Sequence, residues 1–228
     1  MRECCILKIL HIINNLGSGG AEKLIEESLP IMNNFQGIKA DVLLLTDDKN
    51  VFDKTLKLKG IKVDVIKFRS IYNPLNILEI KKYIKKNNYD IVHAHLFPTQ
   101  YWVAIASKLM FRNRPKFITT EHSTHNRRRD KFYFRFIDKY IYSSYDLIIS
   151  ISQKTQENLV YWLRPKANQL KKFIVIENGI NIDKFRNAIP YKKEELNPSF
   201  TEETKLICMV GRFSEQKDQA TLIKAMKY

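Results

Sequence analysis

The sequence predicts an α/β fold, a parallel sheet covered by helices on both faces. Two observations predict it. Apolar runs of strand length recur along the chain with helical patterns between them, an alternation typical of parallel sheets. Several of the runs are continuously apolar, as expected for strands buried on both faces.

Seven apolar runs are predicted as strands: residues 8–13, 40–45, 62–66, 91–95, 116–120, 146–150 and 173–176. Five helices are predicted between them: residues 21–33, 75–86, 99–110, 129–142 and 154–163. Pro30 stands inside the first helix, where it predicts a kink or an early end.

The alternation stops near Asn181. Residues 181–203 are polar with two prolines and are predicted as an interdomain linker with a short helical turn at residues 183–185. A further apolar run, residues 205–210, predicts a new strand followed by the start of a helix. We therefore expect residues 1–180 to form an N-terminal domain. Residues 204–228 would be the incomplete start of a second domain, because one strand and part of a helix cannot bury a core.

The composition indicates which classes of partner the protein favours and which cellular compartment it suits. The chain carries 39 Lys and Arg against 24 Asp and Glu, a net charge of +15, which favours polyanions such as nucleic acid, anionic lipid or phosphorylated substrates. Its three cysteines show no disulfide or metal-binding spacing, which fits a reducing cytoplasm. We recognise no signal peptide and no apolar stretch near the roughly 18 residues that span a bilayer.

Three of the seven glycines fall in the stretch GSGGAE, which follows the first predicted strand. Glycines there let a ligand approach the backbone, and the helix that follows offers free N–H groups. Gly17 and Gly19 fit the dinucleotide pattern G-x-G-x-x-G/A, but Glu22 takes its sixth position and brings negative charge, so a dinucleotide site is disfavoured. The alternative is a turn and a helix start, with Glu22 complementing the helix dipole.

Histidines and a glutamate lie near the ends of two strands. His93 and His95 alternate along the fourth strand and are expected to point to opposite faces, so that they cannot both bind one metal without distortion. We predict His93 in the core and His95 at a cleft. Glu121, His122 and His125 follow the fifth strand, where site residues usually lie. A polar catalytic loop is favoured over a metal triad there, and a solvated loop is the alternative.

The predicted helix at residues 129–142 carries a wide face of aromatic and aliphatic side chains at helical spacing, which predicts core packing. The basic residues from Arg127 to Lys139, together with KKYIKK at residues 81–86, form a face that could meet anionic lipid. A solvated basic face is the alternative. No nucleic-acid-binding pattern is present, so nucleic acid is not an expected partner.

A last motif, GRFSEQKD, follows the predicted strand at residues 205–210. Arg212 and Lys217 stand beside a helix start, where two cations make a good clamp for a diphosphate. The alternative is a βα loop with ordinary surface charge.

Together these motifs resemble glycosyltransferase family 4, the retaining GT-B enzymes with two Rossmann-like domains that build lipopolysaccharide, capsule or glycolipid. The matching motifs occur in the family's order and cover almost the whole chain. They are GSGGAE, DIVHAHLF, TTEHS, YDLIISIS, VIENGINIDKF and VGRFSEQKD.

The resemblance implies an N-terminal acceptor-binding domain and a C-terminal domain that binds a nucleotide-diphosphate sugar. It places Gly19 and Gly20 against the donor, His122 at the transferred sugar, and Arg212 and Lys217 on the diphosphate. That last role is electrostatic, so neither a metal nor another cofactor is expected. His95 and Glu121 are further candidates for the acceptor cleft. The acceptor would be a glycan or a lipid-linked glycan at the inner face of the membrane.

The chain departs from the family in its length. Members carry, further along, two glutamates spaced eight apart that hold the donor, and this sequence stops at Tyr228 before such a pair. We therefore expect either a fragment or a truncated gene product that is inactive alone. One alternative is a non-catalytic domain that binds acceptor lipid or a partner transferase. Another, an NAD-type oxidoreductase, rests on Gly17 and Gly19 alone.

Overall fold

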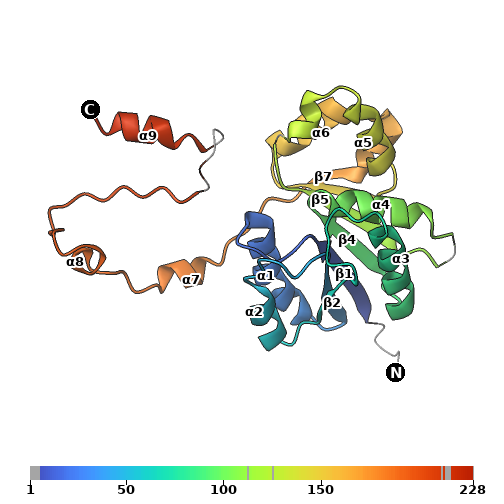
Figure 1. Cartoon of the computed structure of the whole chain (residues 1–228), viewed down its shortest axis with the longest axis horizontal. Helices are drawn as coiled ribbons and strands as arrows, with labels where there is room; N and C mark the ends of the chain where they lie inside the picture. The colour runs from blue at the N-terminus through green and yellow to red at the C-terminus, as the bar shows by residue number, and fades with distance from the viewer. Residues whose placement is uncertain (1–5, 112, 125, 212, 214–216, 228) are drawn as a thin grey trace. The chain divides into compact units, whose positions relative to one another are not determined.

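The computed structural model describes residues 6–111, 113–124, 126–211, 213 and 217–227. The chain divides into two compact units, residues 1–180 and residues 181–228 (Figure 1). The first unit contains a parallel seven-stranded sheet in the order β3-β2-β1-β4-β5-β6-β7. Its strands are β1 (Leu7–Ile13), β2 (Ile38–Leu44), β3 (Val63–Val65), β4 (Ile91–His95), β5 (Lys116–Glu121), β6 (Leu147–Ser150) and β7 (Phe173–Val175). All seven predicted strands are present, each within two residues at either end.

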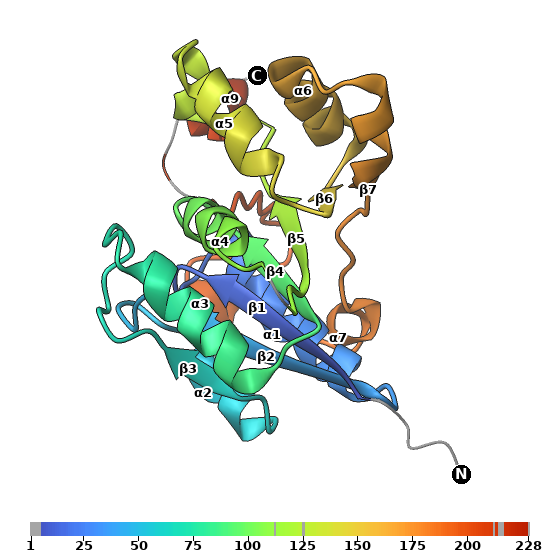
Figure 2. The same cartoon turned by 90° about the vertical axis from the view of Figure 1, so that its right-hand side faces the viewer.

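Helices cover both faces of the sheet, as the sequence predicts (Figure 2). They are α1 (Gly20–Asn33), α2 (Asp53–Leu58), α3 (Asn76–Asn87), α4 (Thr99–Lys108), α5 (Phe134–Tyr142) and α6 (Gln153–Leu163), with 3-10 turns η1 (Arg127–Asp130) and η2 (Ala167–Lys172). The helices α3 to α6 pack on one face around Leu10, Ile12 and Phe117. The helices α1 and α2 pack on the other around Ile13 and Leu44. β1 and β4 are neighbours in the sheet although β2 and β3, the two strands of the other half, lie between them in sequence. The strand order therefore reverses between them, and open α/β sheets bind ligands at such a point.

One helix prediction is wrong at its end, and one helix was not predicted. α1 continues three residues past Pro30, so an early end there is wrong. Pro30 lies in the last turn, where only one N–H is lost and the N–H of Asn34 still donates to the Pro30 carbonyl at 3.2 Å. The short helix α2 lies between the second and third strands, where no element was predicted.

The predicted apolar face of residues 129–142 is not core, and the helix begins only at Phe134. Most of that face is exposed to solvent: Phe132, Tyr133, Phe136, Ile137 and Tyr140. The inward side instead carries Asp138, which is 1% exposed and accepts hydrogen bonds from the Tyr101 hydroxyl and the Trp162 indole. These two donors hold the Asp138 side against the domain, and so turn the aromatic side outward.

In the second unit the described residues form the short helices α7 (Ile182–Arg186), α8 (Lys193–Leu196) and α9 (Gln219–Ala225). α7 confirms the helical turn predicted at residues 183–185. Residues 205–210 form no strand, which contradicts the prediction. Their larger apolar side chains are exposed, from 42% for Met209 to 92% for Val210. A strand needs a neighbour for its N–H and C=O groups, and no strand of the described residues pairs with this segment. No helix of the described residues is both long and apolar enough to span a membrane.

Candidate functional site

Loops from β1, β4 and β5 meet at the carboxyl edge of the sheet, where the strand order reverses. Asn14, directly after β1, ties two of these loops together. Its Nδ2 donates to the Phe97 carbonyl at 2.9 Å, and its Oδ1 accepts from the Thr99 hydroxyl at 2.7 Å. The same edge therefore carries the glycine loop, the end of β4 and the residues after β5.

The glycine loop leads into the N-terminus of α1. A Cβ built on Gly19 would lie 2.2 Å from Glu22 Oε2, so the Glu22 carboxylate occupies the space beside Gly19. Burial raises the pKa of Glu22. A Cβ on Gly20 would meet no atom within 4 Å, and Gly20 is exposed. The carboxylate beside Gly19 is the negative charge for which the sequence disfavours a dinucleotide site, whereas the open surface at Gly20 leaves room for a ligand.

Four of the five histidines of the chain gather at this edge. His11 Nδ1 lies 3.0 Å from His95 Nε2, and His95 Nδ1 lies 3.1 Å from His122 Nε2. The ring centroids of His93 and His95 are 4.1 Å apart. The expectation that His93 and His95 point to opposite faces is therefore wrong, because residues two apart in a strand line the same face.

Burial sets the protonation of these four histidines. It lowers the pKa of His11 and of His122 to about 4, and it lowers the pKa of His93 and His95 well below the ordinary value. Neighbouring imidazoles lower the last two pKa values further, because like charges disfavour one another. At neutral pH the cluster is therefore uncharged.

Three of the imidazoles approach the spacing of a metal site. His11, His93 and His95 each bring a ring nitrogen within 4.8 Å of the others. Hydrogen bonds already engage ring nitrogens of all three, since His93 Nε2 lies 2.7 Å from the Thr120 hydroxyl. We therefore describe the group as a hydrogen-bonded cluster and assign it no metal.

Glu121, predicted at the acceptor cleft, is 6% exposed and anchors the structure around it. Its Oε2 lies 3.3 Å from Arg129, whose side chain is also 6% exposed, and it accepts a hydrogen bond from the Tyr142 hydroxyl. Burial raises the pKa of Glu121, and the two nearby arginines, Arg129 and Arg128, oppose that rise. Glu121 thereby fastens the turn η1 and the helix α5 to the end of β5.

A cavity of about 140 Å³ lies beside these residues, and His122, Glu121, Ser123 and Arg128 are among those that line it. The Arg128 guanidinium stacks over the Phe97 ring with 4.0 Å to its centroid. The cavity thus combines a neutral imidazole, a buried carboxyl group and a positioned cation.

His11, Asn14 and Arg128 were not predicted as site residues. A histidine inside the otherwise apolar run of β1 was the available signal for His11. Arg128 was noted only as part of a basic face.

Of the two residues predicted as the donor clamp, Arg212 lies outside the described residues. His125, a candidate of the loop after β5, also lies outside them. Lys217 is exposed in the second unit.

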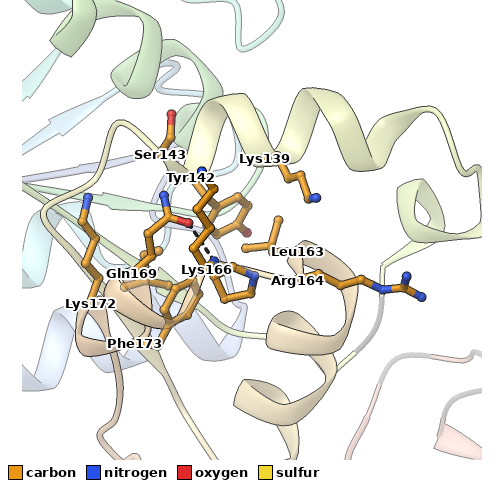
Figure 3. Close-up of a pocket in the computed structure, with 11 residues that line it drawn as sticks. Lys139, Tyr142, Ser143, Leu163, Arg164, Lys166, Gln169, Lys172 and Phe173 are labelled. Carbon is orange, nitrogen blue, oxygen red and sulfur yellow. Dashed lines mark hydrogen bonds between the residues drawn. The ribbon is translucent and has the colours of Figure 1, made fainter.

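A second, larger cavity of about 230 Å³ lies between α5, α6 and η2. Figure 3 shows Tyr142, Leu163 and Phe173 around it, while Arg164 extends away from the other lining side chains. Its described lining residues include no histidine and no carboxylate. The histidine edge is therefore the better candidate for chemistry.

Most of the first unit matches a known protein family. The family description "Glycosyltransferase Family 4" matches residues 18–184, more than half of the chain. The chain belongs to glycosyltransferase family 4. The match begins just before Gly19 and runs past β7, so it includes Gly19, Gly20, the lining of the cavity beside His122, and three of the four clustered histidines, His11 lying before its start.

This family 4 chain is 24% identical over 230 residues to the capsular polysaccharide biosynthesis glycosyltransferase CapH of Staphylococcus aureus, covering 97% of this chain and 58% of CapH. Among solved structures it resembles HepE of Anabaena in complex with UDP and glucose, with 22% identity and a TM-score of 0.59 over 78% of this chain and 46% of HepE. A glycosyltransferase of Rickettsia africae gives 23% identity and a TM-score of 0.59 over 81% and 47%.

These likenesses support the GT-B type of fold for the first unit. The chain spans about half the length of the relatives it matches.

Proposed function

We propose that this chain supplies the acceptor side of a retaining glycosyltransferase that moves a sugar from a nucleotide-diphosphate sugar to a glycan or lipid-linked glycan of the cell envelope. One observation carries the proposal. In a family 4 chain, the open backbone at Gly20 and the cavity beside His122 both lie at the edge where the sheet reverses its strand order. The bound UDP and UDP-glucose in the HepE structures support a nucleotide-sugar donor.

Each residue has a distinct role in this proposal. Gly20 leaves space for the donor, and the uncharged His122 contacts the transferred sugar. Arg212 and Lys217 hold the diphosphate and stabilise the negative charge that develops on the leaving group. His95 acts through His122. Glu121 acts through the turn that carries Arg128.

Calorimetric titration of the full-length protein with UDP tests the clamp. We expect Arg212→Ala and Lys217→Ala each to weaken binding by about tenfold or more, because a charge-assisted hydrogen bond contributes about 1.5–3 kcal/mol. Lys224→Ala on α9 removes the same charge from an exposed neighbouring site and is the matched control. UDP affinity that is unchanged in both clamp variants would refute the assignment.

We further propose that the exposed aromatic face, Phe132, Tyr133, Phe136, Ile137 and Tyr140, docks the enzyme on an anionic membrane. Basic residues accompany this face, including the exposed Lys131 and Lys139. Apolar rings beside lysines and arginines are typical of elements that lie in a membrane interface. A lipid-linked acceptor would then be presented at the surface on which the enzyme sits.

Vesicle co-sedimentation tests the docking. Binding should be strong on vesicles with anionic lipid, weak on neutral ones, and reduced by Phe136→Ser. Phe35→Ser is the control, because it also removes an exposed ring. Phe35 lies in the loop after α1, a helix on the opposite face of the sheet, so this variant should bind vesicles as the wild type does. Equal binding to both vesicle types would contradict the proposal. Vesicle binding by a full-length protein that binds no UDP would favour a non-catalytic lipid-binding domain.

A further inference from the structure

Three imidazoles form a series from the core to the cavity, and we name His11, His95 and His122 the histidine chain. We propose that His11 and His95 fix the tautomer of His122, so that His122 carries its proton on Nδ1 and offers that N–H as a hydrogen-bond donor. His95 is then a positioning residue for the group expected to contact the sugar. The contact between His122 and the sugar rests on the proposed function, whereas the tautomer of His122 does not.

The chain admits two arrangements of protons. A neutral imidazole has one N–H and one lone pair, and both ring nitrogens of His95 are engaged, at 3.0 Å by His11 and at 3.1 Å by His122. His95 must therefore donate at one nitrogen and accept at the other. Either all three histidines carry their proton on Nδ1, or all three carry it on Nε2.

The buried end of the chain selects between these arrangements. His11 is 4% exposed, and its Nε2 is buried without a hydrogen-bond partner. A proton there would leave a buried N–H unsatisfied, which is rare in folded proteins, whereas an unsatisfied acceptor is less unusual. His11 therefore carries its proton on Nδ1 and donates to His95 Nε2. His95 in turn donates from Nδ1 to His122 Nε2.

Two further features support the series. The pKa of each member is lowered by burial, so all three are neutral at pH 7 and the one-proton count holds. His93 stands beside the series, but its Nε2 lies 2.7 Å from the Thr120 hydroxyl. The series therefore runs through His95 alone.

The arrangement determines what His122 can do. Its Nε2 accepts from His95, which leaves Nδ1–H for a ligand in the cavity that His122 lines. A neutral N–H of this kind recognises an acceptor oxygen, such as a sugar hydroxyl. It cannot accept a proton, so His122 in this state is a binding donor and not a general base.

Two-bond ¹H–¹⁵N spectra of the ¹⁵N-histidine-labelled chain at about pH 7.5, without ligand, test the proposal. We expect His11, His95 and His122 all as Nδ1–H tautomers. His11→Phe removes the first donor and should let His95 and His122 populate both tautomers. His11→Asn keeps an N–H near the position of Nδ1 and should preserve the wild-type pattern. His93→Phe alters a neighbouring histidine outside the series and should also preserve it.

An Nε2–H tautomer at His122 in the wild type would overturn the proposal, and this result needs no variant to fold. Unchanged tautomers in His11→Phe, or the same change in His93→Phe, would also overturn it. So would displacement of the histidine N–H signals by one equivalent of Zn²⁺, which would indicate a metal site. The tautomers are measured without donor or acceptor, so their outcome is independent of whether the protein transfers a sugar.

Discussion

Lowering the pH from about 7.5 to about 5 is expected to destabilise the first unit through its buried histidines. The pKa of His11 is about 4 in the folded chain, because burial excludes water from the imidazolium, against an ordinary value of 6.5. Between these values the unfolded chain binds more protons than the folded one, so stability falls as the pH falls. The contribution is fully present above pH 6.5 and is lost as the pH approaches 4.

The magnitude follows from the two pKa values of His11. Each pKa unit is worth about 1.4 kcal/mol. By linkage, the free energy of unfolding loses about 2 kcal/mol at pH 5 and about 3 kcal/mol at pH 4 from His11 alone. His122, with the same folded pKa, adds a similar loss. The imidazoles that face His11, those of His93 and His95, have lowered pKa values and act in the same direction.

Urea denaturation followed by tryptophan fluorescence measures the effect. Both tryptophans, Trp102 and Trp162, lie in the first unit, so the signal reports on that unit. His11→Asn removes the titrating group, and its loss of stability between pH 7.5 and pH 5 should be smaller than that of the wild type by about 2 kcal/mol. Equal losses in the two proteins would refute the argument that His11 is held neutral by burial.

Three substitutions test other parts of the structure. Gly20→Ala should keep or raise the melting temperature, since a Cβ there is unobstructed and alanine favours a helix over glycine by up to about 1 kcal/mol. The same variant should bind UDP more weakly in a calorimetric titration, because its methyl group would take up space proposed for the donor. Arg129→Ala should cost about 3–5 kcal/mol in urea denaturation, because it leaves the buried Glu121 carboxyl group without its ion-pair partner. Asp138→Ala should cost about 2–4 kcal/mol by the same measurement, because it orphans the Tyr101 hydroxyl and the Trp162 indole. A loss below about 1 kcal/mol in either of the last two would contradict the anchoring roles.

Much of the fold could be predicted because strands and helices each have a characteristic local pattern of apolar residues. The continuous apolar runs predicted all seven strands, and the order of the motifs by itself indicated the family. One error has a cause that lies outside the local sequence. The segment at residues 205–210 has the composition of a strand but no strand beside it among the described residues.

The site was only partly predictable. Positions after strands identified Gly20, His95 and His122, because the carboxyl ends of parallel strands share one edge. Glu121 was predicted to line the acceptor cleft, and in the structure it is also buried in contact with Arg129 and Tyr142. His11 was not predicted as a site residue, because a single histidine in an apolar strand gives no indication of which other side chains it contacts.

The sequence by itself determined the α/β alternation, the run of family 4 motifs and the strand ends at which chemistry is expected, because each depends on residues close together in the chain. Only the tertiary structure decided that His11 meets His95, 84 residues away, and that the aromatic side of α5 faces outward. Both depend on how separate elements pack. The first follows from the parallel pairing of β1 with β4, and the second from the two donors that hold Asp138 inside.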